Sequence, residues 1–166
     1  ESFKVWTEQT ALALGVAPAA WFADYFRLKK AHALKALDAL ISEGTLFEVA
    51  VKGETTPYYA HRTMKKTLKA IADGAVVPSR TVLLSPFDPV VWDRERLLAM
   101  FGMDYKIEVY TPEHKRRYGY FTLPILHEGS IVGRLDPKAH RAQKRFEVRA
   151  IHLEPGVTVD DGLVHG

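Results

Sequence analysis

The stretch LLSPFDPVVWDRERLLAMFGMDYKIEVYTPEHKRRYGY, residues 83–120, joins a helix-like first half of the chain to a second half with strand-like patterns. Pro86 and Pro89 exclude regular helix or sheet pairing, so an irregular corner is predicted around them. Apolar residues then recur with a helical period up to Gly102, a residue type that commonly ends helices. Apolar and polar residues alternate over residues 105–110, which predicts a strand.

The sequence before this stretch has the pattern of three helices followed by a hairpin. The helices are expected over residues 3–15, from Pro18 onward, and over residues 29–42. Two strand-like segments, residues 45–51 and 58–61, flank a turn that contains glycine and proline. This order is that of a winged helix. A fourth, short helix is expected over residues 63–73, with Met64, Leu68 and Ile71 facing inward.

The later part of the chain contains several short strand patterns separated by turns. Strands are expected over residues 118–126, 130–136 and 145–153, with a short basic segment over residues 137–143. The predicted fold class is therefore α+β, a winged helix followed by a small antiparallel β-barrel-like domain. The expected domains are a winged helix over 1–75, a linker strand, proline-rich corner and helix over 76–104, a β-domain over 105–154, and a flexible tail over 155–166.

The composition is that of an ordinary folded protein and excludes several function classes. The chain has 166 residues, of which 47% are hydrophobic and 26% are charged, so disorder is not expected. The net charge is only +3, so a polyanionic partner must be argued from where the cations lie. There is no cysteine, which excludes disulfides and Cys-ligated metal sites and fits a reducing cytoplasm. No membrane span or signal peptide is visible.

Four segments together resemble the YcaQ/AlkZ type of bacterial DNA glycosylase, which excises alkylated bases and unhooks interstrand crosslinks. They are GVAPAAWFADYFRLKKAHALKALDALISEGTLFEVAV, SPFDPVVWDRERLLAMFG, DYKIEVYTPEHKRRYGYFTLPIL and GRLDPKAHR. The resemblance implies a row of winged-helix modules followed by a β-barrel, with no cofactor. It also implies a catalytic Gln-x-Gln or Gln-x-Asp motif in an N-terminal module. Gln9 and Gln143 are the only glutamines here, and neither has the required partner two residues later.

The resemblance therefore predicts the DNA-binding C-terminal portion of such an enzyme, inactive alone. A start without methionine is expected of a cut piece. The expected partners are duplex DNA and missing N-terminal winged-helix modules of the parent chain, and the resemblance implies a cytoplasmic, nucleoid-associated location. Neither a membrane nor an obligate oligomer is expected. Two alternatives remain open, a winged-helix transcription regulator with a ligand-sensing β-domain and a purely structural module that packs on the missing part.

Basic residues gather in clusters with aromatics and histidines, and any one cluster taken alone is more readily explained as a solvated face. The start of a third helix is where a helix-turn-helix module meets DNA, and a loop tip with several cations suits phosphates. The candidate DNA-binding residues are Lys29, Lys30, His32, Lys35, His114, Lys115, Arg116, Arg117, Lys138, His140 and Arg141.

The carboxylates of the corner have structural explanations. Asp93 and Glu95 fall in the first turn of a helix, where negative charge is favourable. Asp88 is expected to be structural, together with Trp92, either as a cap of the following helix or as an acceptor for backbone N–H groups at the corner. No histidine pair has the spacing of a metal site, so no catalytic residue and no metal ligand is assigned.

Overall fold

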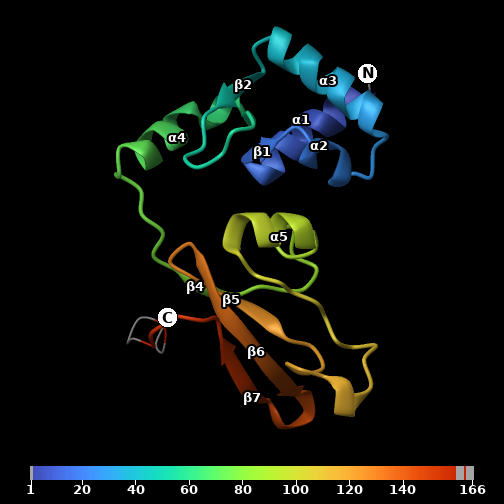
Figure 1. Cartoon of the computed structure of the whole chain (residues 1–166), viewed down its shortest axis with the longest axis vertical. Helices are drawn as coiled ribbons and strands as arrows, with labels where there is room; N and C mark the ends of the chain where they lie inside the picture. The colour runs from blue at the N-terminus through green and yellow to red at the C-terminus, as the bar shows by residue number, and fades with distance from the viewer. Residues whose placement is uncertain (1, 160–162, 164–166) are drawn as a thin grey trace. The chain divides into compact units, whose positions relative to one another are not determined.

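The computed structural model describes residues 2–159 and 163 and shows a mixed α/β protein with two antiparallel sheets (Figure 1). The chain divides into two compact units, residues 1–76, called unit 1, and residues 77–166, called unit 2. No helix in the described part of the chain is long and apolar enough to span a membrane.

Unit 1 combines helices with a three-stranded sheet. Its elements are α1 (Ser2–Leu14), β1 (Val16–Pro18), α2 (Trp21–Asp24), α3 (Lys30–Ser42), β2 (Leu46–Val49), β3 (Tyr58–His61), a 3-10 turn η1 (Arg62–Met64) and α4 (Lys65–Ala72). The sheet has the strand order β1-β3-β2, and every pairing is antiparallel. The pairing of β2 with β3 confirms the hairpin expected from the sequence.

The core of unit 1 forms because α3 presents one apolar stripe. Ala33, Ala36, Leu37 and Leu40 are buried, and their spacing of three and four residues places them on one helix face. Leu37 and Leu40 pack in one cluster with Phe22 of α2. The opposite face of α3, including its first turn, is left to solvent.

The helix expected from Pro18 is wrong at its start. Pro18 is instead the last residue of β1 and lies opposite Tyr58 of β3. Proline is tolerated there because β1 is an edge strand, which needs no donor on its outer side. The helical run is only Trp21–Asp24, and Arg27 shortly afterwards has a positive φ of 53° that is incompatible with a helix.

Helix α4 forms as predicted, but its inward face is only partly formed. Met64 and Leu68 are half-buried, whereas Ile71 is half exposed, so the prediction that it faces inward is wrong. The helix has no buried residue at all, because no other described element of unit 1 covers it closely. Lys65 and Lys66 are exposed at its start.

Unit 2 is built on an open four-stranded sheet. Its elements are β4 (Thr81–Leu83), α5 (Arg94–Phe101), a 3-10 turn η2 (Glu113–Lys115), β5 (Leu123–His127), β6 (Ser130–His140), a 3-10 turn η3 (Arg141–Gln143) and β7 (Arg145–Leu153). The strand order is β4-β5-β6-β7, and neighbouring strands are antiparallel. The prediction of a β-barrel is wrong. The outer strands β4 and β7 do not pair with each other, so no closed barrel forms among the described residues.

The strand expected over residues 105–110 is also wrong. Tyr105 is buried and Ile107 and Val109 are half-buried, so the alternation does reflect burial. However, no described strand pairs with this segment, because its polar residue Glu108 makes hydrogen bonds with a loop. The Glu108 side chain accepts hydrogen bonds from backbone N–H groups of residues 117–119, which closes a loop instead of a ladder.

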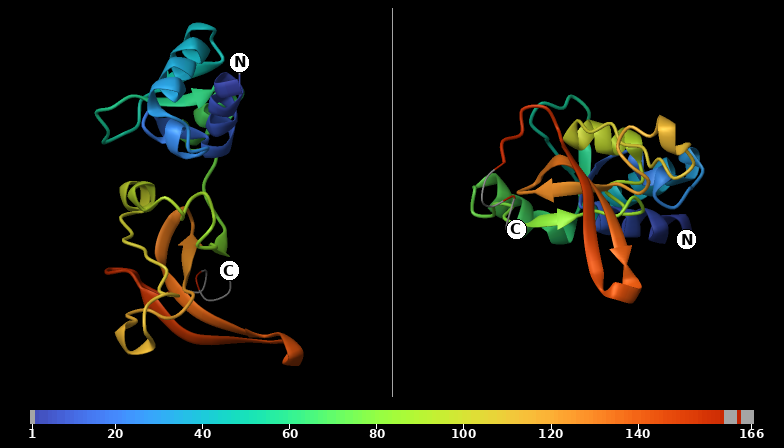
Figure 2. Two further views of the ribbon diagram at one scale, coloured as in Figure 1. Left: turned by 90° about the vertical axis from the view of Figure 1, so that its right-hand side faces the viewer. Right: turned by 90° about the horizontal axis from the view of Figure 1, so that it is seen from below.

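Strand β6 is longer than expected and makes a projecting hairpin with β7. The basic segment expected over residues 137–143 does not interrupt the sheet at its start, because β6 continues through Pro137 to His140. Pro137 lies opposite Val148, next to a register shift that accommodates the proline. The left-hand view in Figure 2 shows this hairpin, in orange, extending beyond the rest of the sheet of unit 2.

The tail expected over residues 155–166 is described only in part. Residues 160–162 and 164–166 lie outside the described residues. Val157 and Leu163 pack against a buried cluster formed by Ile125, Val132 and Leu135 of the sheet.

A buried arginine fixes the corner that precedes α5. Arg96 is 1% exposed, and its guanidinium donates to the Pro89 carbonyl at 2.8 Å and to the Asp93 carboxylate at 2.9 Å. Asp93 is also the N-cap of α5, since it accepts the backbone N–H of Arg96 at 3.0 Å. Gly102 ends the helix with a left-handed φ of 68°, which agrees with the prediction from the sequence.

Replacing Arg96 by alanine should therefore lower the free energy of unfolding of unit 2 by about 3–5 kcal/mol, because the Asp93 carboxylate would lose its buried partner. Scanning calorimetry of the two proteins measures this difference. The control is Arg94→Ala, two residues away and exposed, which should change stability by no more than about 0.5 kcal/mol. Equal effects of the two substitutions would contradict the role of Arg96.

Candidate nucleic-acid interface

The start of α3 presents a cluster of exposed cationic and imidazole side chains. Lys29, Lys30, His32 and Lys35 are all exposed, and none has an ion-pair partner among the described residues. The His32 ring lies 4.5 Å from the Phe3 ring of α1, measured between centroids, so α1 supports this end of α3. The four side chains are brought together near the start of one helix.

The backbone at this point also favours an anion. Lys29 is the N-cap residue of α3 and makes no capping hydrogen bond with its side chain. The Lys29 carbonyl accepts the His32 N–H at 2.9 Å, but a lysine side chain cannot accept the N–H groups of Lys30 and Ala31, so these two donors and the positive end of the helix dipole face solvent. Two lysines beside free backbone donors form a surface on which a phosphate oxygen is favourable.

A second cluster lies on a loop of unit 2, residues 104–122, called the basic loop. Its ends are tied together by the Glu108 carboxylate. This carboxylate accepts the backbone N–H groups of Arg117 at 2.9 Å, Tyr118 at 2.7 Å and Gly119 at 3.2 Å. Partial burial raises the pKa of Glu108, but these three donors and the nearby Arg116 outweigh burial and hold the pKa below its ordinary value.

The cations of the basic loop differ in how they are held. His114 and Lys115 lie on η2 and are exposed. Arg116 is half-buried, because its Nε donates to the Thr111 carbonyl at 2.9 Å and its guanidinium lies 4.9 Å from the Tyr120 ring centroid. Arg117 is exposed above the Tyr118 ring. The loop therefore presents its charge from a fixed backbone.

The base of the basic loop rests on β6 and β7. Arg134 of β6 is buried and its guanidinium lies 4.0 Å from the Tyr118 ring centroid. The same guanidinium donates to the Glu154 carboxylate at 2.8 Å. His152 of β7 packs edge-on against Tyr118. Gly119 is required at this point, because a Cβ there would collide with the Asp136 carboxylate.

The third cluster lies near the end of the β6–β7 hairpin. Lys138 and Arg141 are exposed, whereas His140 is half-buried and its Nε2 lies 2.5 Å from a carboxylate oxygen of Glu147. This hydrogen bond is the main reason that the pKa of Glu147 lies below its ordinary value. His140 is thus engaged within the hairpin, and the charge presented to solvent comes from Lys138 and Arg141.

The three clusters are distributed over both units. The α3 cluster belongs to unit 1, and the other two belong to unit 2. Within unit 2, the left-hand view of Figure 2 shows the gold η2 turn and the orange hairpin end on different sides. The two clusters of unit 2 are therefore separate contact points rather than parts of one continuous site.

Sequence reasoning missed the two residues that hold the basic loop. In the strand expected over residues 105–110, Glu108 occupies a polar, outward-facing position. Arg134 falls in the strand expected over residues 130–136, and the strand pattern alone gives no function for it. Buried arginine is rare without a partner, so its position between apolar residues of a strand was the one available signal. No local pattern reveals that a carboxylate will accept N–H groups nine to eleven residues later.

The two residues assigned a structural role lie at the corner. The Asp88 carboxylate accepts the Val90 N–H at 2.9 Å, and the Asp88 carbonyl accepts the N–H groups of Val91 and Trp92. Gln9 is exposed on α1 of unit 1, and Gln143 is exposed on η3 of unit 2.

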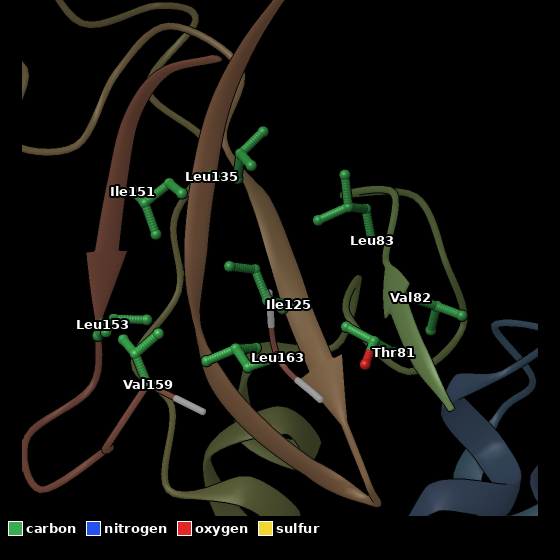
Figure 3. A pocket seen from close by; sticks show the side chains of 9 residues that line it. All are labelled: Thr81, Val82, Leu83, Ile125, Leu135, Ile151, Leu153, Val159 and Leu163. Atoms are coloured by element: carbon green, nitrogen blue, oxygen red, sulfur yellow. The ribbon is translucent and has the colours of Figure 1, made fainter. Parts of the chain in front are cut away.

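Unit 2 also has an apolar pocket of about 380 Å³ on one face of its sheet. Figure 3 shows its lining, in which the Thr81 hydroxyl is the only polar side-chain group among the described residues. Leu83 and Ile125 come from neighbouring strands, and Leu163 comes from the C-terminal segment. A lining with no described acid, base or cation offers no group for hydrolysis or for binding a phosphate.

The DNA glycosylase AlkZ-like family matches residues 8–161, which is nearly the whole chain. The chain belongs to the AlkZ-like DNA glycosylase family. This confirms the resemblance seen in the sequence, and it indicates a function in DNA repair of the glycosylase type, with DNA as substrate or partner. No solved structure matches the chain.

The lowered pKa of Glu108 makes the order of the basic loop depend on pH. A folded-state pKa below the ordinary value stabilises the loop above the ordinary carboxyl range, and this stabilisation is lost as the pH falls through the lowered pKa. In an NMR titration, the amide protons of Arg117, Tyr118 and Gly119 should therefore move together at acidic pH. The Glu108→Gln variant should abolish this transition, and its persistence would show that another group causes it.

Proposed function

We propose that the chain is the DNA-binding C-terminal portion of an AlkZ-like glycosylase, and that it binds duplex DNA through the three basic clusters. The proposal rests on one observation above all, the family match over residues 8–161 in a chain whose exposed cations lie on fixed backbone. Phosphate contacts supply most of the affinity in non-specific DNA binding, and such contacts require cations that are not paired within the protein.

In unit 1, the order of elements and the exposed start of α3 support a winged helix with α3 as the recognition helix. In such modules the N-terminal residues of this helix contact DNA, while a neighbouring helix and the hairpin support it. Lys29, Lys30, His32 and Lys35 would contact phosphates or base edges. The packing of Phe3 against His32 supports this role, because it limits the motion of a side chain that would otherwise lose entropy on binding.

In unit 2, the exposed groups of the basic loop would contact the DNA backbone. His114, Lys115 and Arg117 are exposed, and Arg116 is the residue that braces the loop from within. Lys138 and Arg141 would add contacts from the hairpin. The arrangement supports binding that is weak, independent of sequence and steep in salt.

The catalytic step is proposed to depend on a Gln-x-Gln or Gln-x-Asp motif outside this chain. Gln9 and Gln143 lie in different units, and neither has a glutamine or aspartate two residues later. The carboxylates Asp88 and Asp93 already bond backbone N–H groups, and Asp93 is also paired with Arg96. Both carboxylates are thus engaged in holding the corner, which favours a structural role over a role as general base.

Removing two exposed cations of the basic loop should weaken DNA binding, because fewer phosphates are then neutralised by the protein. For the double variant Lys115→Ala and Arg117→Ala, the slope of log affinity against log salt should fall by about 0.9 for each phosphate that is no longer contacted. Fluorescence anisotropy with a labelled duplex at several salt concentrations measures the slope. Lys65→Ala with Lys66→Ala removes the same charge from α4 and should leave the slope nearly unchanged. An unchanged slope in the loop variant would show that the loop is only a solvated edge.

The chain alone should release no base from a duplex that contains a 7-alkylated purine, because it lacks the glutamine motif. Chromatography of the released bases measures the activity, and a family member that carries the motif provides the positive control. Release of base by this chain at a rate above the uncatalysed one would place the catalytic residues within residues 1–166.

A further inference from the structure

A small aromatic pocket opens beside the corner that precedes α5. Its volume is about 180 Å³, and the rings of Phe87, Trp92 and Tyr105 form much of its lining. Arg94 is the one charged residue among the described lining residues. Pockets for drug-sized ligands have volumes of roughly 300–1,000 Å³, so this pocket suits a fragment with one planar ring system.

The Phe87 ring is presented to solvent by a backbone that cannot easily move. The side chain is 72% exposed, which contributes little to folding. The Phe87 N–H donates to the Ser85 hydroxyl at 3.2 Å, and the Asp88 N–H donates to the Ser85 carbonyl at 2.9 Å. The buried Arg96 holds the next carbonyl, that of Pro89. A rigid turn that exposes a phenyl ring is expected of a contact surface.

The charge of the pocket favours an anionic or electron-rich partner. Arg94 is exposed and has no ion-pair partner among the described residues. Two carboxylates adjoin Arg94 in the sequence: Asp93 is paired with Arg96 at 2.9 Å, and Glu95 forms no ion pair with Arg94 among the described residues. No carboxylate of the described part of the chain lines the pocket. Phe87 also lies beside Phe121, with 6.3 Å between ring centroids, and remains 72% exposed. A guanidinium next to such a ring can contact a phosphate while a base stacks on the exposed part of the ring.

We propose that this pocket binds a single unpaired nucleobase of DNA, stacked on Phe87 and Trp92, with the adjoining phosphate near Arg94. The inference rests on the proposed DNA-binding function and adds a subsite to it. Stacking on aromatic rings is possible for every base, so the pocket selects an unpaired base rather than a sequence. The Tyr105 hydroxyl donates to the Thr122 carbonyl at 2.7 Å, and the described lining has no carboxylate or imidazole, so the pocket holds a base without cleaving its bond.

The test compares two labelled duplexes of the same sequence, one fully paired and one with a single extra unpaired thymine. Because one base stacked on an aromatic ring changes affinity by about tenfold, the chain should bind the second duplex about tenfold more tightly. Phe87→Leu keeps an apolar side chain but removes the ring, so the ratio of the two affinities should fall toward one. Phe87→Tyr keeps the ring and should keep the ratio. Anisotropy titrations measure the affinities, and melting temperatures verify that the variants are folded.

Tyr110→Leu is the matched control, since Tyr110 is 96% exposed in the same unit but does not line the pocket. It should keep the preference for the unpaired base. The proposal is overturned if the wild-type chain binds both duplexes equally, if Phe87→Leu keeps the wild-type ratio, or if Tyr110→Leu removes it. A chain that binds neither duplex would instead overturn the proposed DNA-binding function as a whole, so the two failures are distinguishable.

Discussion

The guanidinium of Arg96 is the interaction on which unit 2 most depends. It is buried between the Pro89 carbonyl and the Asp93 carboxylate, and it thereby joins the proline-rich corner to the first turn of α5. A buried charge must be paired, so conformations of the corner that break these contacts are disfavoured. The consequence reaches the surface, because Phe87, Trp92 and Arg94 are positioned by the same corner.

In the basic loop, as at the corner, one charged side chain fixes the backbone through several hydrogen bonds. Here the charged group is a carboxylate instead of a guanidinium. The Glu108 carboxylate gathers three consecutive backbone N–H groups, and Arg134 and His152 hold the Tyr118 ring from the sheet side. A loop that carries several cations would otherwise be extended by their mutual repulsion. Fixing its backbone by a carboxylate leaves the cationic side chains available to solvent, which is what a phosphate-binding surface requires.

Membership of the AlkZ-like family and the exposure of these cations lead to the same functional interpretation from independent directions. The family indicates that the partner or substrate is DNA, and the exposed cations indicate which surfaces of this chain would contact its phosphates. Unit 1 offers lysines beside uncapped helix donors, whereas unit 2 offers a braced loop, a hairpin and an aromatic pocket. The apolar pocket shown in Figure 3 has none of these groups among its described residues.

The sequence by itself determined the elements whose signals are local. The apolar stripe of α3, the β2–β3 hairpin and the cap at Gly102 were all predicted, because periodicity and capping depend on residues within a few positions of each other. The family could be recognised for the same reason, since its segments are continuous. The clusters of cations were also visible, although not which of them are exposed.

Only the tertiary structure decided the elements that depend on distant partners. Residues 105–110 alternate like a strand, but Glu108 bonds to residues 117–119 and no described strand pairs with the segment. Pro18 resembled a helix start, yet its pairing with Tyr58 makes it the end of an edge strand. Hydrogen bonds and packing between residues far apart in the sequence outweigh local preferences of about 1 kcal/mol or less per residue, and the sequence pattern records only the local preferences.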